Sequence, residues 1–472
     1  MPTRLPFNAE GRRTWRTILT LLVLCLGISS CSPTPEAAPQ AQPRQPIAGG
    51  PTLLRDDLTL RRIGPAGPTS IRLAVDPTDG ALYVLSFGNG LTRVDPASGT
   101  TTPVATIADL VGTGTPSGMA FGPNGTLYLV ANRPSGARTK GLIRRGKPAD
   151  PASWITVAET AQYPLSGTNF DHLFNGIAVS PDGAWLFVNS GSRTDHGEVQ
   201  ANSGNFPGSR EVALTSRIFR IPADATDLRL ENDEAKLAPY VYVRGLRNAY
   251  DLAFAPNGDL FAVDNGPDAD LPDELNWIQE GRHYGFPWRF GDQPNPVTVV
   301  GFDPAQDGRL NQDFTAVQQG LYVADTNFPP PPMPFTDPIL NRGPAAAIYR
   351  SADGKEQNGA ADAGALQTFT PHRSPLGLLF VPTNGFPDDL LSSNERQSAL
   401  LLSWGAAGGN LSDTGQDLLH LALTREGDTY SAVTTQIARD FKRPIDAVLI
   451  GTKLYLLEFE GEGVIWELTF AS

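Results

Sequence analysis

The sequence predicts an all-β chain folded as a β-propeller of six blades. Two observations support this prediction: a hairpin-like pattern that recurs about six times, and a surplus of turn residues, with 48 Gly and 42 Pro in 472 residues. Because 40% of the residues are hydrophobic, these turn residues belong to a globular chain and not to a low-complexity one. All-β architectures often hold a long chain in one unit, so the length does not require two or three domains.

Each repeat has an apolar alternating run, a turn rich in Pro, Asn, Asp and Gly, and a second apolar run. Alternation is typical of strands, and such turn residues supply the positive φ that tight hairpins need. The spacing widens along the chain, which predicts insertions between blades, the largest within 283–370. A seventh blade hidden there, or a pair of β-sandwiches, would also fit. The copies lie at 71–86, 118–132, 176–190, 251–265, 376–385 with a second run at 399–404, and 445–459.

The N-terminus has the features of a secretory signal. Several arginines precede an apolar run over 18–28 that is too short to cross a bilayer comfortably. The run ends in Ile28-Ser29-Ser30-Cys31, which resembles a bacterial lipobox. Cleavage before Cys31 and its lipidation would make residues 1–30 a lipoprotein signal peptide. An ordinary signal peptide with an incidental cysteine fits the same residues.

The rest of the chain divides into a linker and a body. Residues 31–50 contain Cys31 and a stretch rich in Pro, Ala and Gln, which is typical of an extended tether. Residues 51–472 contain the repeats and form the predicted propeller. We expect an exported protein held at the bacterial cell envelope by its lipid, without a membrane-spanning helix. The formal net charge of −13 argues against a nucleic-acid partner.

One candidate for chemistry lies immediately before the third repeat, in Asn169-Phe170-Asp171-His172. Propellers bind ligands at the mouth of the central channel, on loops that lead into and out of the inner strands. A histidine there, with a carboxylate beside it, can act as a general base near neutral pH. A histidine in this position is also commonly a hydrogen-bonded structural residue.

A second candidate is the stretch from Gly245 to Trp288. Arg247-Asn248 precedes the fourth repeat and Asp264-Asn265-Gly266-Pro267 follows it, before Asp273-Glu274 and a YGFP sequence at 284–287. Arginine suits bidentate binding of carboxylates, and a Gly-Pro turn can present carbonyl oxygens to a hard cation. The same residues would also suit a well-capped junction between two blades.

In this order, RN, an LAF strand, NGP, DELN and YGFP resemble the signature of the soluble, PQQ-dependent glucose/sorbosone dehydrogenase family. In that family HRN, E-x-GP, DE-[IVL]-N and YGWP follow one another. The segment DHLFNGIAVSPDG at 171–183 also resembles the surroundings of its catalytic histidine. The resemblance spans most of 55–460. It implies a six-bladed propeller that oxidises an aldose or sugar aldehyde with PQQ and Ca²⁺ and passes electrons to an external acceptor.

Carried over residue by residue, the resemblance implies a catalytic site. His172 would be the general base that takes the hydroxyl proton of the sugar while hydride passes to PQQ. Asp171 matches a carboxylate that commonly precedes this histidine. Arg247 and Asn248 would meet PQQ and polarise its reactive carbonyl, with Asn265 beside them.

The resemblance also implies a cation site and anchors for the cofactor. The backbone oxygens of Gly266 and Pro267 would bind Ca²⁺, and Asp273 and Glu274 would support that turn. PQQ carries three carboxylates, which need cationic partners. The candidates for that role are Arg443, His372 and Arg373.

Some positions depart from the family pattern. An acidic residue usually follows the catalytic strand in a GD pair, whereas this chain has Ser190-Gly191-Ser192-Arg193-Thr194-Asp195. Either Asp195 substitutes, or the base lacks that orienting carboxylate. A late lysine that contacts PQQ has no match. These departures favour a divergent or sorbosone-type branch. A propeller lactonase and a cofactor-free propeller that binds glycan or protein remain alternatives.

Overall fold

The computed structural model describes residues 47, 49–332, 334–361, 366–406 and 408–471. The predicted signal peptide, Cys31 and nearly all of the Pro-rich linker lie outside the described residues, so these predictions stay predictions. In the part that is described, no helix is long and apolar enough to span a membrane.

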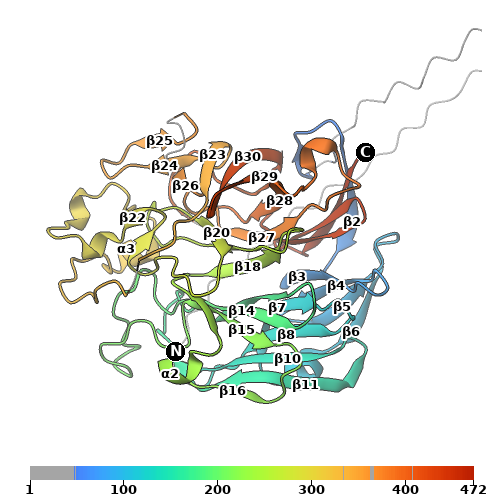
Figure 1. The fold of residues 1–472 in the computed structure, drawn as a ribbon, viewed down its shortest axis with the longest axis horizontal. Coiled ribbons are helices and arrows are strands. Elements are labelled where there is room, and N and C mark those ends of the chain that lie inside the picture. The colour runs from blue at the N-terminus through green and yellow to red at the C-terminus, as the bar shows by residue number, and fades with distance from the viewer. Residues whose placement is uncertain (1–46, 48, 333, 362–365, 407, 472) are drawn as a thin grey trace, which may run out of the picture. The chain divides into compact units, whose positions relative to one another are not determined.

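Six sheets, each built around antiparallel strands, form the blades of a propeller, which confirms the predicted fold (Figure 1). Five blades have at least four strands, and the fourth blade has three. Blade 1 is β3 (Ser70–Val75), β4 (Leu82–Ser86), β5 (Gly90–Val94) and β6 (Thr101–Ala105); blade 2 is β7 (Thr115–Phe121), β8 (Leu127–Asn132), β10 (Gly141–Lys147) and β11 (Asp150–Thr160), extended by β16 (Leu228–Leu230); blade 3 is β13 (Phe174–Val179), β14 (Trp185–Ser190), β15 (Arg217–Pro222) and β17 (Val241–Arg244). Blade 4 is β18 (Ala249–Phe254), β19 (Leu260–Asp264) and β20 (Glu274–Ile278); blade 5 is β27 (Pro375–Phe380), β28 (Arg396–Ser403), β29 (Asp417–Glu426) and β30 (Thr429–Arg439); blade 6 is β31 (Pro444–Ile450), β32 (Lys453–Glu458), β33 (Val464–Phe470) and β2 (Leu58–Pro65).

The repeats seen in the sequence are the first two strands of each blade. A glycine with positive φ closes the turn between them, a conformation that a residue with a Cβ adopts only with strain. Asp76 and Gly80 illustrate the turn: the carbonyl of Asp76 accepts a hydrogen bond from the Gly80 amide at 2.8 Å. The turn glycines are Gly80, Gly125, Gly183, Gly258, Gly385 and Gly451, with φ between 61° and 90°.

The first strands of the blades contact one another in ring order, from β3 through β7, β13, β18, β27 and β31 back to β3. Apolar clusters fill the spaces between neighbouring blades, so each sheet buries both of its faces. This ring excludes the alternative of two β-sandwiches.

The N-terminal strand completes the last blade. β2 runs antiparallel to β33, with Leu58 opposite Phe470 and Pro65 opposite Val464. Leu58 is fully buried in the cluster that contains Trp466. Just before it, β1 (Thr52–Leu53) pairs with β30 of blade 5.

A long insertion separates β20 from the fifth blade, and its described residues contain no seventh blade. Between β20 and β23 (Leu340–Pro344), a segment that we call the insertion (residues 279–339) includes the short helix α3 (Thr315–Gln318) and the 3-10 turns η1 (Pro296–Thr298) and η2 (Pro304–Gln306). β23 adds to β30 in parallel. The remaining short elements are β9 (Arg138–Thr139), β12 (Tyr163–Pro164), β21 (Arg289–Phe290), β22 (Gln293–Pro294), β24 (Ile348–Arg350), β25 (Glu356–Asn358), β26 (Leu366–Gln367), α1 (Ile107–Val111), α2 (Glu234–Leu237) and η3 (Asp388–Leu390).

Candidate active site

A cavity of about 490 Å³ lies where the inner strands of blades 3 to 6 begin. Residues just before or at the start of β13, β18, β27 and β31 line it, together with residues that follow β19 and β28 and a segment of the insertion around α3. Its size suits a small ligand. The lining includes Phe170, His172, Arg247, Asn248, Tyr250, Asn265, Gly266, Pro267, Asp268, Asp273, Asp313, Phe314, Thr315, His372 and Trp404.

His172 is held in one tautomer by Ser192. Its Nδ1 lies 3.0 Å from the Ser192 Oγ, and that hydroxyl donates its only proton to the Thr194 carbonyl at 2.8 Å. Ser192 must therefore accept from His172, so Nδ1 carries the proton and Nε2 keeps a free lone pair. Burial, with a smaller effect of the nearby Arg247, lowers the pKa of His172 to about 3. The imidazole is thus neutral at pH 7, as a proton acceptor must be.

Neither predicted acid partner contacts the His172 ring. The Asp171 carboxylate accepts from the backbone amides of Ser166 at 2.8 Å and Gly167 at 3.1 Å, and it does not line the cavity. Asp195 is bonded to Arg247 instead. The sequence analysis did not identify Ser192 as a partner of His172. Its hydroxyl group just after the second strand of the third repeat could have indicated this role.

Arg247 is a buried cation fixed by three hydrogen bonds. Its Nε donates to the Asp195 carbonyl at 2.7 Å, its Nη2 to the Asp195 carboxylate at 2.8 Å, and its Nη1 to the Asn265 carbonyl at 3.2 Å. A guanidinium has five N–H groups, so two remain without an acceptor in the described part of the chain. Since Arg247 lines the cavity, these two donors are available to a ligand.

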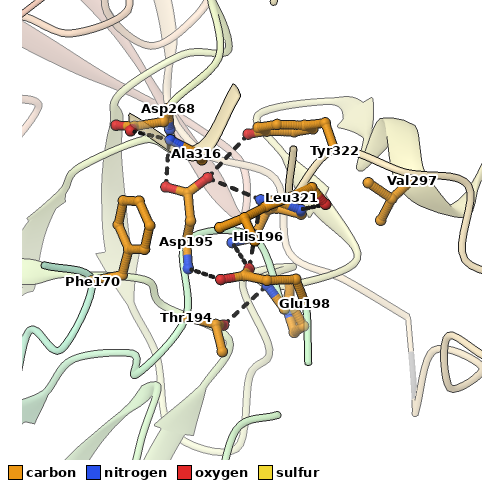
Figure 2. A network of polar contacts seen from close by, with 12 residues as sticks. Phe170, Thr194, Asp195, His196, Glu198, Asp268, Val297, Ala316, Leu321 and Tyr322 are labelled. Atoms are coloured by element: carbon orange, nitrogen blue, oxygen red, sulfur yellow. Dashed lines mark hydrogen bonds and ion pairs between the residues drawn. The ribbon is translucent and has the colours of Figure 1, made fainter. Parts of the chain in front are cut away.

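Asp195 is saturated with donors, as Figure 2 shows. Besides Arg247, its carboxylate accepts from the Asp268 amide at 3.0 Å, the Tyr322 hydroxyl at 3.1 Å and the His196 Nδ1 at 2.9 Å. Burial opposes ionisation, but Arg247 and His196 outweigh it and hold the pKa of Asp195 well below its usual range.

Asn175 and Asn189 orient the Asn248 amide toward the cavity. The Gly176 amide donates to Asn175 Oδ1 at 2.5 Å, and Asn189 Nδ2 donates to the same oxygen at 2.7 Å. Asn175 must then use its Nδ2 to donate to Asn248 Oδ1, at 2.8 Å. Among the described residues the Asn248 Nδ2 has no acceptor, and it lies at the cavity wall.

The Gly266-Pro267 turn lies at the cavity with its oxygen atoms partly unused. Asp273 shapes the turn, because its carboxylate accepts from the Gly266 amide at 2.7 Å and the Ser374 amide at 2.9 Å. Within the described residues the Gly266 carbonyl accepts no hydrogen bond, while the Pro267 carbonyl accepts from the Ala269 amide at 2.8 Å. Asn265, 8% exposed, has a buried Oδ1 with no partner. Unused carbonyl oxygens are ligands that a hard cation prefers.

Glu274 lies behind the turn and does not line the main cavity. With Asp264 it borders a second cavity of about 10 Å³, which is enough for one water molecule. The two residues are cross-strand partners on β19 and β20. Burial and the neighbouring Asp264 raise the pKa of Glu274 to about 8, so this pair holds a proton near pH 7.

The three residues predicted to bind the carboxylates of PQQ are placed differently. His372 lines the cavity, and its Nε2 lies 2.9 Å from an Asp270 oxygen. Arg373 is 1% exposed and is bonded to Asp413 and Asp417, away from the cavity. Arg443 lies beside the lining, where its Nη1 donates to the carbonyls of residues 405 and 406 at 3.1 and 3.2 Å.

Arg247 is thus the arginine that the cavity offers to an anion. Asp268 and Asp313 contribute negative charge to the same lining. Among the described residues, no three His, Cys, Asp or Glu side chains form a group that could hold a metal ion. A cation here would therefore depend on the backbone oxygens of Gly266 and Pro267, with few side-chain ligands.

The fold and the site define a six-bladed propeller with a polar cavity at the end of its inner strands, in which a neutral histidine, a fixed arginine and unused carbonyl oxygens meet. Residues 118–301 match the model of the family described as Glucose / Sorbosone dehydrogenase. The matched residues include the third and fourth blades and the loops that carry His172 and Arg247, so the central part of this chain is similar to that family.

One curated relative matches over a short segment. Quinoprotein glucose dehydrogenase B of Acinetobacter calcoaceticus is 46% identical to this chain over 48 residues, which are 10% of this chain and 10% of that protein. The chain thus aligns with about a tenth of the length of the curated relative that it matches.

Solved structures extend the similarity over the propeller. The apo form of the soluble aldose sugar dehydrogenase from Escherichia coli has 15% identity over 88% of this chain and 99% of its own, with a TM-score of 0.54. The holo form of the PQQ domain of pyranose dehydrogenase from Coprinopsis cinerea has 14% identity over 89% and 97%, with a TM-score of 0.53. At these identities the comparison shows a shared fold.

Proposed function

We propose that the protein is a PQQ- and Ca²⁺-dependent dehydrogenase that oxidises an aldose or sugar aldehyde. The observation that carries this proposal is the meeting of a neutral His172 imidazole, whose Nε2 is free, with two unused N–H groups of Arg247 in one cavity. A proton acceptor beside a fixed cation is what removal of a hydroxyl proton and stabilisation of developing negative charge require. The match of residues 118–301 to the glucose / sorbosone dehydrogenase model supports the same reaction.

Two sets of polar groups in the cavity would bind the two cofactors: N–H groups would bind PQQ, and carbonyl oxygens would bind Ca²⁺. Arg247 and the Asn248 amide would hold the carbonyl edge of PQQ, and His372 would lie near it. The carbonyl oxygens of Gly266 and Pro267 would hold Ca²⁺, whose charge would also offset Asp268. When bound, PQQ supplies a hydride acceptor and Ca²⁺ supplies Lewis-acid polarisation.

The residues of this chain would act on the substrate as follows. His172 Nε2 takes the proton of the hydroxyl on the carbon to be oxidised, while Ser192 holds the opposite ring nitrogen. Arg247 stabilises negative charge without reorientation, because Asp195 already fixes its guanidinium. Aromatic rings of Phe170, Phe314 and Trp404 line the cavity and would pack against the apolar face of a sugar ring.

The N-terminal predictions belong to the same proposal. A lipid on Cys31 would hold the propeller at the cell envelope, outside the cytoplasm, on a Pro-rich tether. The enzyme would then oxidise sugars outside the cytoplasm and pass electrons to an external acceptor. Mass spectrometry of the mature N-terminus would show a diacylated Cys31; an unmodified N-terminus at another residue would refute the anchor.

Reduction of an artificial dye tests the reaction. The purified protein, loaded with PQQ and Ca²⁺, should reduce the dye with one or more sugars of an aldose panel, and omission of PQQ should abolish the reaction. His172→Gln should bind PQQ with unchanged affinity and lose turnover by about 10²- to 10⁴-fold. Absence of PQQ binding at micromolar concentration would refute the proposal. Lactone hydrolysis without PQQ would favour the lactonase alternative.

A further inference from the structure

Four charged side chains of alternating sign lie in a buried row behind the cavity. Glu198 is followed by His196, then Asp195, then Arg247, and none of the four residues is more than 8% exposed. His196 Nδ1 is 2.9 Å from an Asp195 oxygen and 3.5 Å from a Glu198 oxygen. The other Asp195 oxygen is 2.8 Å from Arg247 Nη2. Buried charges are tolerated when each has partners of opposite sign, as each has here.

His196 is an imidazolium in this row. Its Nε2 faces the Leu321 carbonyl at 3.3 Å, which can only accept, so Nε2 carries a proton. Its Nδ1 faces a carboxylate that is ionised, so Nδ1 also donates. Burial opposes the charge, but Glu198 and Asp195 outweigh it and raise the pKa of His196. The His196 ring also stacks on Tyr322, with centroids 4.0 Å apart.

The insertion reaches Asp195 directly through Tyr322 and indirectly through Asp268. The Tyr322 hydroxyl donates to the same carboxylate oxygen as His196, at 3.1 Å, and Tyr322 is 2% exposed (Figure 2). The Ala316 amide donates to the Asp268 carboxylate at 3.0 Å, while the Asp268 amide donates to Asp195. The segment that carries these groups also places Phe314 and Thr315 in the cavity.

We propose that His196 and Tyr322 are positioning residues that hold Asp195 as a fixed counter-ion and thereby orient the two free N–H groups of Arg247 into the cavity. The inference rests on the proposed function only in that those N–H groups meet a cofactor. Without His196 and Tyr322, one Asp195 oxygen would lose both of its donors and the carboxylate could rotate. Arg247 would then keep only its bonds to backbone carbonyls, which do not fix the plane of the guanidinium as a carboxylate does. The insertion thereby affects the orientation of Arg247 through Asp195. In the described residues it makes no hydrogen bond to the Arg247 side chain itself.

A cofactor-free measurement tests the geometry. In protein labelled with ¹⁵N-arginine, the Arg247 Nη2–H donates to the Asp195 carboxylate and should give a slowly exchanging resonance, assigned by its loss in Arg247→Lys. Tyr322→Phe and His196→Gln should speed its hydrogen exchange about 10- to 100-fold, as expected when a charged group loses a hydrogen bond. Selective ¹⁵N-histidine labelling should show two protonated ring nitrogens for one histidine, and this signature should vanish in His196→Gln.

Matched control variants separate positioning from general destabilisation. Tyr455→Phe removes another buried hydroxyl bonded to a carboxylate, Glu467 at 2.7 Å, in blade 6. His420→Gln removes another buried histidine, bonded to Ser398 at 2.7 Å in blade 5. Both controls should lower the melting temperature and leave the Arg247 exchange rate unchanged. Unchanged exchange in Tyr322→Phe, or equal acceleration in Tyr455→Phe, would overturn the proposal.

Cofactor binding gives a second readout. Tyr322→Phe should raise the Kd of PQQ about 10-fold or more, whereas Tyr455→Phe should not change it. If the unmodified protein binds no PQQ, the proposed function fails while the exchange measurement still decides the role of His196 and Tyr322. If PQQ binds equally to all variants and exchange is unchanged, the positioning role fails while the proposed function stands.

Discussion

Replacing Ser192 by alanine should slow turnover moderately, because Ser192 fixes the His172 tautomer without entering the reaction. The Nδ1–Oγ hydrogen bond of 3.0 Å is the interaction that favours the tautomer with a free Nε2. A net value of about 0.5–1.5 kcal/mol for such a bond corresponds to roughly a 2- to 13-fold change in population. We therefore expect kcat to fall by about that factor, well short of the roughly 10²- to 10⁴-fold loss expected when the base itself is removed.

Ser192→Asp should change the pH dependence in a defined direction. The pKa of His172 is lowered to about 3 by burial and by Arg247, so the unmodified enzyme keeps a neutral base down to acidic pH. A carboxylate at position 192 would face Nδ1 and favour the imidazolium, which raises the pKa of His172. Since the protonated ring cannot accept a proton, activity in Ser192→Asp should be lost at a higher pH than in the unmodified enzyme.

Steady-state dye reduction at saturating PQQ, measured from pH 4 to 9, is the assay for both variants. Melting temperatures measured at each pH serve as the control for unfolding. A loss in Ser192→Ala as large as that in His172→Gln would refute the tautomer argument. An acidic limb that does not move in Ser192→Asp would refute the assignment of His172 as the titrating base.

Three further variants test the site and the fold. In Gly191→Ala the new Cβ would lie 2.5 Å from the His172 Cβ, so His172 must move; we expect kcat to fall by about 100-fold, and an unchanged kcat would contradict the packing. Burial raises the pKa of Asp446 to about 7, so the folded chain binds a proton that the unfolded chain releases near pH 4, and this contribution to stability is lost as pH rises toward 7. The melting temperature of Asp446→Asn, relative to that of the unmodified protein, should thus rise between pH 5 and 8. A difference in melting temperature that does not change with pH would exclude the titration of Asp446. Leu58→Ala should destabilise the chain by about 2–5 kcal/mol in denaturant unfolding, whereas an unchanged midpoint would mean that β2 does not close blade 6.

The repeats could be predicted from the sequence because each hairpin is local. Period-two alternation and a turn glycine such as Gly125 lie within fifteen residues of each other, so short-range physics decides the strand pair. The N-terminal strand of the last blade could not be found this way. Leu58 and Phe470 lie at opposite ends of the chain, and no local pattern links them.

The sequence could predict site residues only where they lie next to a repeat strand. His172, Arg247 and Asn248 precede inner strands, and the structure brings all three into one cavity. Arg373 follows His372 directly, yet it is bonded to Asp413 and Asp417 within blade 5, because neighbouring side chains can point to opposite sides. Tyr322 lies in an insertion without a repeat pattern, so no periodicity marked it.

Because β2 pairs with β33, the propeller can close only after β33 has been synthesised. The strand that emerges among the first must remain without its partner until the last strand has been made. A chain that stops short of residue 464 would present an unpaired sheet edge on β2 and on β32, which is a template for association with other chains. In the finished protein, a force applied through the N-terminal segment would first reach the short pair of β1 and β30 and then the β2–β33 pair, so the strand that closes the ring would also bear the tension of any anchor attached ahead of it.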